Sequence, residues 1–261
     1  MRVWCRSYWT PKASCTDKDY EDAFAWWPRG QLEGVRGERF RFAAADGASA
    51  SSYSRLWARQ LVRGFVTDRL QKGTLAEALL ALREGWVRGV RRAQRGRPLP
   101  WYAEEKLGKG AFAALVGLEL IDEGAEEPDR WKWRAFAVGD SCLVHMRERK
   151  VELTFPIDRA DLFGVNPVLL STDTAGNAVA LRESKHVEGS GIAGDRFYLM
   201  TDALAQWFLR QVEESREPWI PLQDFDRDPA APLFRDWVTG LRDSGQMRND
   251  DVTLLRIEVE R

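Results

Sequence analysis

The stretch FRFAAADG, residues Phe40–Gly47, is a mostly apolar run that ends in an acid and a glycine. Such a run, rich in aromatic and small residues, predicts a buried β-strand. Two other runs share the pattern: Phe197–Met200 leads into Thr201-Asp202-Ala203, and Asn249-Asp250-Asp251 leads into Val252–Val259. Carboxylates at strand ends can converge on a cation, because hard divalent metals prefer oxygen ligands. The pattern therefore favours metal-dependent chemistry.

The hydrophobic patterns of the remaining chain predict more strands than helices. Strands are expected at Val3–Trp9, Ala23–Trp27, Phe40–Ala45, Ala111–Ile121, Trp131–Val138, Leu143–Arg147, Val151–Phe155, Phe197–Thr201 and Val252–Val259. Helices are expected at Ser51–Leu70, Thr74–Ala93, Leu204–Val212 and Leu233–Leu241, with Ser51 and Thr74 as N-caps. Residues 156–185 read as a long surface excursion, and residues 218–232 as an irregular connection. The long helices come as adjacent pairs, so we expect an α+β layered domain rather than a doubly wound one.

Composition narrows the class of protein. The 261 residues are 44% apolar and 30% charged, which fits one large globular domain, or two small ones. Lys and Arg number 39 against 40 Asp and Glu, so nothing indicates a nucleic-acid binder. No apolar run is long enough for a membrane span. The cysteines Cys5, Cys15 and Cys142 form no CxxC pair, so we expect reduced thiols and a cytoplasmic location.

Several catalytic classes lack their residues. With only His145 and His186, the chain has no HExxH and no plausible histidine-rich zinc site. A G-x-S-x-G elbow is missing, and no Cys is followed six residues later by the Arg of a cysteine phosphatase. The segment 107–113, LGKGAFA, imitates the glycine-rich loop of a protein kinase. No H-R-D or D-F-G follows it, so a turn before a buried strand is the better interpretation.

The acids gain meaning from their order along the chain. Six short elements follow one another: Tyr20-Glu21-Asp22-Ala23-Phe24, Ala44-Ala45-Asp46-Gly47, Gly110–Gly117, Val138-Gly139-Asp140-Ser141, Thr201-Asp202-Ala203 and Asn249-Asp250-Asp251-Val252-Thr253. Each alone is more typical of a turn or a cap than of a ligand. Clustered in space, however, these acids would repel unless a cation neutralises them or some take up protons. The ordered series resembles the metal-dependent PP2C-type (PPM) protein serine/threonine phosphatases, of the bacterial single-domain kind.

The resemblance implies a fold and a metal centre. The fold would be a four-layer α-β-β-α sandwich with two central antiparallel sheets, formed by residues 1–261 as one domain with a flap-like excursion at about 156–185. Asp46 would bridge two Mn²⁺ or Mg²⁺ ions. Asp202 and Asp250 would complete one ion, and Glu21 with the Gly47 carbonyl would serve the other. The remaining acids, Asp22, Asp140 and Asp251, would support these ligands or hold a weaker third ion.

The same resemblance implies a reaction. Asp46, Asp202 and Asp250 would act through metal-bound water, so that a metal-bridged hydroxide hydrolyses phosphoserine or phosphothreonine. The partner would be a phosphorylated protein, with a cognate Ser/Thr kinase or its target as a further candidate; neither nucleic acid nor membrane is expected.

Three positions depart from the family pattern. Ala203 replaces a glycine, and Phe112 stands where a small hydroxyl residue is common. The family's phosphate-binding arginine corresponds to Asp17, an acid that would repel phosphate, which leaves Lys18 and Lys12 as candidate phosphate-binding residues. The alternative function is therefore a pseudophosphatase, a phosphoprotein-binding regulatory module with little or no catalysis.

Overall fold

Two antiparallel sheets form the centre of the protein. The computed structural model describes residues 1–70, 73–94, 110–122, 131–164, 166–225 and 232–260. Sheet I has the order β3 (Leu32–Arg36), β1 (Arg2–Thr10), β12 (Val252–Glu260), β11 (Arg196–Met200), β7 (Cys142–Arg147) and β8 (Lys150–Phe155). Sheet II has the order β10 (Lys185–Gly191), β6 (Trp131–Val138), β5 (Phe112–Ile121), β4 (Arg39–Gly47) and β2 (Ala23–Trp27), and the short β9 (Leu170–Ser171) pairs with β5.

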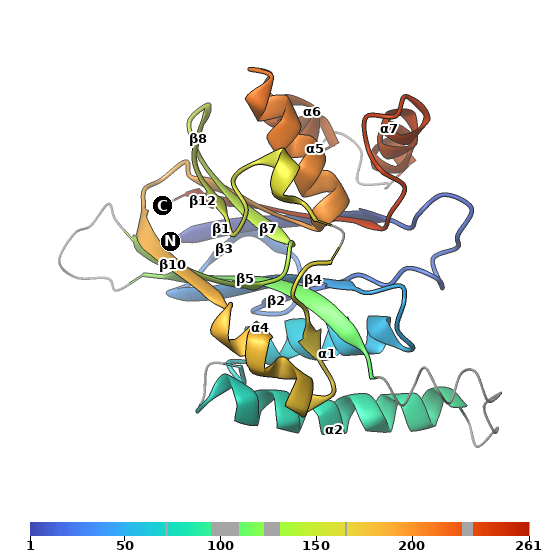
Figure 1. Ribbon diagram of the computed structural model, residues 1–261. Helices are drawn as coiled ribbons and strands as arrows, with labels where there is room; N and C mark the ends of the chain where they lie inside the picture. Colours follow the sequence, from blue (N-terminus) through green and yellow to red (C-terminus); the bar gives the residue numbers. More distant parts are fainter. Residues whose placement is uncertain (71–72, 95–109, 123–130, 165, 226–231, 261) are drawn as a thin grey trace.

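Helices cover the outer face of each sheet (Figure 1). On sheet II lie α1 (Ser54–Val66) and α2 (Leu75–Gln94), and on sheet I lie α5 (Asp202–Glu213), α6 (Trp219–Asp224) and α7 (Pro232–Asp243). Three apolar cores separate the four layers: one under α1 and α2, one between the sheets, and one under α5, α6 and α7. The expected α-β-β-α sandwich with two antiparallel sheets is confirmed.

Strand β4 shows how the opening stretch produces this layering. Its side chains alternate between faces, as they must in a pleated strand. Phe40, Phe42 and Ala44 enter the core between the sheets, whereas Ala43 and Ala45 enter the core beneath α1. Small alanines on the second face let Trp57 of α1, which is fully buried, pack closely on the strand. Burial on both faces explains why the run is nearly continuous in apolar residues.

The expected strands and long helices are present, with small shifts at their ends, while three segments differ. Strands β3 and β10 were not predicted; they are polar, glycine-containing strands at sheet edges, where hydrophobic alternation is weak. The prediction of an irregular 218–232 connection is wrong for α6, since Pro218 is its N-cap and Pro221 lies in its first turn, where proline is tolerated. Residues 226–231 lie outside the described chain, as do residues 95–109, which include most of the kinase-like segment.

Of the two predicted helix N-caps, one is confirmed and one is wrong. Thr74 is confirmed as a capping residue, because it exchanges hydrogen bonds with Glu77: the Thr74 N–H donates to Oε2 and the Glu77 N–H to the Thr74 hydroxyl. The Ser51 cap is wrong, since α1 begins at Ser54 after Tyr53, whose φ is 60°.

The 156–185 excursion is more ordered than the sequence suggested. It carries the 3₁₀ turns at Ala160–Leu162 and Thr174–Asn177, strand β9, and the short helix α4 (Ala178–Arg182). The indole N–H of Trp57 donates to the Leu170 carbonyl at 2.8 Å, which ties the excursion to α1. Among the helices of the described residues, none combines the length and apolarity that a bilayer crossing requires.

Candidate metal centre

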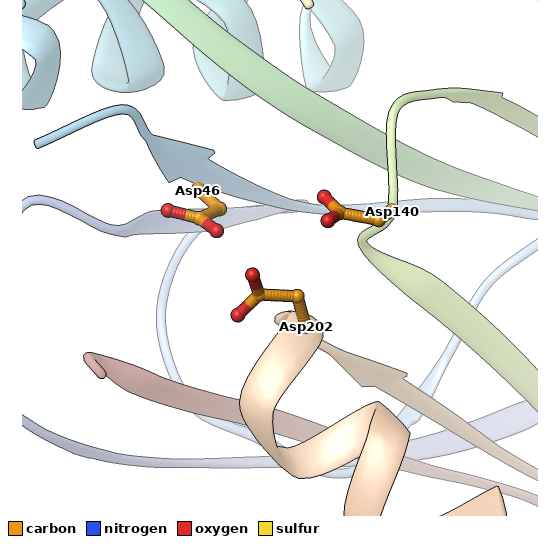
Figure 2. Close-up of side chains that lie close together, drawn as sticks. All are labelled: Asp46, Asp140 and Asp202. Atoms are coloured by element: carbon orange, nitrogen blue, oxygen red, sulfur yellow. The ribbon is translucent and has the colours of Figure 1, made fainter. Parts of the chain in front are cut away.

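Three aspartates converge at one end of the two sheets (Figure 2). Asp46 is near the end of β4, Asp140 is in the turn between β6 and β7, and Asp202 is the first residue of α5. Ligand oxygens of the three all lie within 4.8 Å of one another, and within the described residues this is the one group that meets that criterion. Figure 2 shows the three carboxylates pointing into a shared space. From the sequence, Asp140 was expected to support the ligands or to hold a weaker third ion; in the structure it lies beside Asp46 and Asp202.

Glycines bring two of these acids into position. A Cβ on Gly47 would lie 2.7 Å from the Glu21 carbonyl oxygen and 3.0 Å from Ser54, so only glycine fits where β4 passes these two backbones. Gly139 turns the chain from β6 toward Asp140 with φ of +93°, and its Cβ would meet Ala114 at 2.6 Å. The D-G and G-D pairs in the sequence thus have steric causes.

Asp202 is positioned by the link between β11 and β12. The Thr201 N–H donates to the Thr253 carbonyl at 3.2 Å, and the Thr253 N–H donates to the Thr201 hydroxyl at 2.9 Å. These bonds hold the end of β11 beside the start of β12, so that Asp202 begins α5 next to the segment carrying Asp250. The Ala203 N–H donates to Asp202 Oδ1 at 2.5 Å, while Oδ2 pairs with the Arg248 guanidinium.

The electrostatics of the centre are those of crowded, desolvated acids. Burial, together with the charges of Asp140 and Asp250, raises the pKa of Asp46 to about 7. Burial also raises the pKa of Asp140, although the Arg248 guanidinium opposes the shift. Buried carboxylates of this kind either bind protons or bind a cation. The sequence analysis expected clustered acids to repel one another, and the raised pKa values of Asp46 and Asp140 agree with that expectation.

Glu21 and Asp250 border the three central acids. The Glu21 carboxylate accepts hydrogen bonds from Ser54 at 2.6 Å and from Ser49 at 2.5 Å, so the start of α1 and the loop after β4 hold it in place. Asp250 Oδ1 accepts the N–H of Asp251 at 2.9 Å, and its charge raises the pKa of Asp46. Their service as ligands, with that of the Gly47 carbonyl, remains a prediction.

Asp22 and Asp251 have different surroundings. Asp22 Oδ2 accepts the Thr253 hydroxyl at 2.6 Å, its Oδ1 is buried with no hydrogen-bond partner, and burial together with the Asp46 charge raises its pKa well above the usual range. Asp251 instead accepts two backbone N–H groups, from Lys12 at 2.8 Å and from Glu21 at 2.7 Å. Asp251 thereby fastens the 11–21 loop to β12, which is a structural role close to the ions' expected place.

The two lysines proposed from sequence differ in how close they lie to the acids. Lys12 Nζ is 3.3 Å from Glu21 Oε2 and donates to the Ser49 hydroxyl at 2.7 Å. Lys18 is exposed, and its neighbour Asp17 is paired with Arg235 at 3.1 Å. Of the two lysines, Lys12 is therefore the one that lies beside the acids, and Asp17 is paired with a cation; phosphate binding by either lysine remains a prediction.

Sequence reasoning missed one basic residue of the centre, Arg248. Its guanidinium forms an ion pair with Asp202 Oδ2. It lies two residues before Asp250, in a segment read only for its acids. A motif search for acids could not find it, although an arginine beside a predicted ligand was a visible signal.

Two pockets flank the carboxylates. One, of about 360 Å³, is lined by residues that include Lys12, Tyr20, Glu21 and Arg55. The other, of about 500 Å³, extends from Asp140 along the 156–185 excursion, where Arg182 and Lys185 supply positive charge. A larger pocket of about 540 Å³, lined by residues such as Phe65 and His186, shares no lining residue with the centre. The open space beside the acids is thus bordered by basic side chains on both sides.

The residues present fit hard divalent ions. The donors are carboxylate oxygens, which Mg²⁺ and Mn²⁺ prefer, and buried Asp22 Oδ1 has no other partner. Burial raises the pKa of both Cys5 and Cys142, which disfavours a reactive thiolate at these two residues.

Comparison with known proteins identifies the fold. No protein-family profile and no curated protein matches the sequence. Among solved structures, the fold is similar to the catalytic domain of the serine/threonine phosphatase PstP in complex with two manganese ions, with a TM-score of 0.53, 14% identity, and 100% of this chain and 99% of that one covered. The photosystem II phosphatase PBCP has a TM-score of 0.54, 13% identity and 99% coverage of both chains. The S. agalactiae serine/threonine phosphatase has a TM-score of 0.52 and 12% identity, with 98% of this chain and 100% of that one covered.

Proposed function

We propose that this chain, which has the fold of the PP2C-type phosphatases, is a metal-dependent phosphoprotein phosphatase that hydrolyses phosphoserine and phosphothreonine. The observation that carries the proposal is the convergence of Asp46, Asp140 and Asp202 from three separate elements onto one space. Acids that merely ended strands or capped helices would have no reason to meet there. Two Mn²⁺ or Mg²⁺ ions, with a weaker third, are the cofactors proposed for this space.

The chain's own residues would hold the ions and orient the substrate. Asp46 would contact both ions, Asp202 and Asp250 one of them, and Glu21 with the Gly47 carbonyl the other. When bound, the ions supply charge neutralisation and lower the pKa of a water that attacks phosphorus. Asp140, Asp22 and Asp251 would keep the ligands in place or hold the third ion.

The surroundings of the centre suit a phosphorylated protein segment. Lys12 on one side, with Lys18 farther out, and Arg182 with Lys185 on the other offer cations to phosphoryl oxygens and to acidic neighbours of the phosphorylated residue. The pocket beside the excursion would then take side chains that flank the phosphorylated residue. A phosphoprotein, with a cognate kinase or its target as a second partner, and a cytoplasmic location remain predictions.

The test is phosphate release from phosphoserine and phosphothreonine peptides by the metal-stripped chain. We expect hydrolysis to appear on addition of Mn²⁺, to disappear with a chelator, and to be lost in Asp202→Asn. Hydrolysis that persists without metal would overturn the proposal. Binding of Mn²⁺ and phosphopeptide without any phosphate release would instead support the pseudophosphatase, which the acid at position 17 favours.

A further inference from the structure

Arg248 is the cation that lies closest to the acids in the described chain. Its Nη2 pairs with Asp202 Oδ2, and its charge acts on both Asp46 and Asp140. The Arg248 side chain is one-third exposed, at 33%, whereas that of Asp202 is 11% exposed. The guanidinium thus reaches from the rim into the carboxylate cluster.

The backbone on both sides of Arg248 is fixed. Met247 is buried in the core beneath α5 and α7, and its N–H donates to the Leu241 carbonyl at 3.1 Å. On the other side, Arg242 donates to the Asp250 carbonyl at 2.5 Å and to the Pro11 carbonyl at 3.0 Å. A backbone held on both sides keeps the Arg248 Cα beside the cluster, and the ion pair with Asp202 Oδ2 then orients the side chain.

The pairing places a positive charge on a carboxylate that an ion would use. Asp202 Oδ1 accepts the Ala203 N–H, and Oδ2 pairs with Arg248. Each carboxylate oxygen can accept more than one partner, so an ion could bind at either oxygen. At Oδ2 it would share the oxygen with the guanidinium, and at Oδ1 it would bind the same carboxylate, so the two cations repel in both cases.

The guanidinium compensates the cluster only in part. It carries one positive charge, while it pairs with Asp202 and its charge also acts on Asp46 and Asp140. Its Nε is buried and has no hydrogen-bond partner, and its buried Nη2 contacts Asp202 as an ion pair without forming a hydrogen bond, so the arginine itself is poorly satisfied. A divalent ion carries more charge than the guanidinium and can replace it beside the carboxylates. The arginine is then free to donate hydrogen bonds to other acceptors.

We propose that Arg248 is the internal counter-ion of the metal-free centre, that a divalent ion displaces it from Asp202, and that this competition sets the metal affinity. The inference rests on the proposed function, since it takes Asp202 to be a metal ligand. It adds a residue that tunes the metal requirement: the centre folds with its own cation and accepts Mn²⁺ only by releasing it. Once released, the guanidinium lies at the rim, where a substrate phosphoryl group would arrive.

The test is calorimetric Mn²⁺ binding to metal-stripped Arg248→Gln, with Arg149→Gln as the matched control. Arg149 is an exposed arginine that pairs with Glu217 away from the centre. We expect Arg248→Gln to bind Mn²⁺ roughly three- to tenfold more tightly than the wild type, the scale of one partly exposed ion pair. Arg149→Gln should bind it as the wild type does. An unchanged or weaker Mn²⁺ affinity in Arg248→Gln would overturn the proposal.

A second readout needs no metal at all. In thermal unfolding of the stripped chain, Arg248→Gln should lower the midpoint more than Arg149→Gln, and the conservative Arg248→Lys should recover part of the loss. In an Asp202→Asn background, Arg248→Gln should have a smaller effect, because the partner is already gone. Strictly additive effects would show that the two side chains do not interact and would overturn the pairing.

These outcomes separate the inference from the proposed function. If Arg248→Gln binds Mn²⁺ more tightly but neither the wild type nor the variant releases phosphate from peptides, the phosphatase proposal is refuted and the counter-ion proposal is supported. If the protein hydrolyses phosphopeptides but its Mn²⁺ affinity is unchanged in Arg248→Gln, the counter-ion proposal is refuted and the phosphatase proposal is supported.

Discussion

Strand β11 has an aspartate at each of its two ends, and the two ends differ in how much positive charge surrounds the acids. Asp195 precedes the strand and Asp202 follows it. Asp195 is fully buried, yet hydrogen bonds from Arg147 and the Ile192 N–H, with His145 Nε2 at 3.1 Å, surround it. Burial raises the pKa of Asp195, but these partners outweigh burial and hold it at about 2.

At the Asp202 end the acids have more neighbours of their own kind than cations. There Asp46 has its pKa raised to about 7 by burial, with Asp140 and Asp250 adding to the effect. Burial is common to both ends, so it cannot be what distinguishes them. What differs is whether the fold supplies enough positive charge, and a site left short of it is a candidate for an external cation.

The largest expected effect separates the two ends by activity. Asp46→Asn should lower Mn²⁺-dependent phosphopeptide hydrolysis by on the order of 10²–10³-fold, the scale of losing a group that organises charge in the transition state. Asp195→Asn, measured below its unfolding temperature, should leave the rate per folded molecule unchanged. Equal losses in the two variants would break the distinction between a reactive and a structural end.

Metal binding should separate the ends by stability as well. Mn²⁺ at 100 times its dissociation constant should stabilise the wild type by about 2.7 kcal/mol, which raises the unfolding temperature by roughly 5–10 °C. Asp195→Asn should retain this increase, because its substitution is at the other end of β11. Asp46→Asn should lose it, and calorimetric scans with Mn²⁺ or a chelator measure both. An increase that survives in Asp46→Asn would place the ion elsewhere.

The structural end should be sensitive to substitution and to acid. Asp195→Asn should lower the free energy of unfolding by about 2–3 kcal/mol, less than for a fully buried pair because Arg147 is 32% exposed. Since the pKa of Asp195 lies below its usual 3.8, the native state holds fewer protons there than the unfolded state. The stabilisation is therefore present above about pH 4 and is lost as the pH falls toward 2.

Urea unfolding at several pH values checks this sign. Between pH 4 and pH 2 the wild type should lose stability more steeply than Asp195→Asn, so the two curves should approach each other. Curves that stay parallel over this range would show that Asp195 does not titrate with a lowered pKa.

The smallest expected effect concerns Asp251, which lies near the metal centre but binds backbone N–H groups. Lys12 and Glu21 donate to different oxygens of Asp251, so Asp251→Asn keeps only one of the two hydrogen bonds; it should cost about 1–2 kcal/mol of stability and preserve hydrolysis. Asp251→Ala, which removes both acceptors, should cost more. Loss of Mn²⁺ binding in Asp251→Asn would make this residue a ligand and enlarge the centre.

The elements with strong periodicity were predictable from the chain alone. Strand β4, helix α2 and the acids at strand ends follow from local patterns, because burial on a pleated or helical surface imposes a period on the sequence. The edge strands β3 and β10 were not, since their pairing partners come from distant segments and their own residues are polar. Helix α6 was missed because its prolines resemble those of a loop.

In the metal centre, too, some features were predictable from the sequence and others were not. The carboxylates at strand ends, Asp46, Asp202 and Asp250, indicated a metal site because hard divalent ions prefer oxygen ligands, and the family resemblance added Glu21. Only the folded chain shows that Asp140 joins Asp46 and Asp202, that Asp251 binds backbone N–H groups, and that Arg248 pairs with Asp202. Residue type and order are written locally, whereas charge compensation depends on which distant side chains the packing of two sheets brings within a few ångströms.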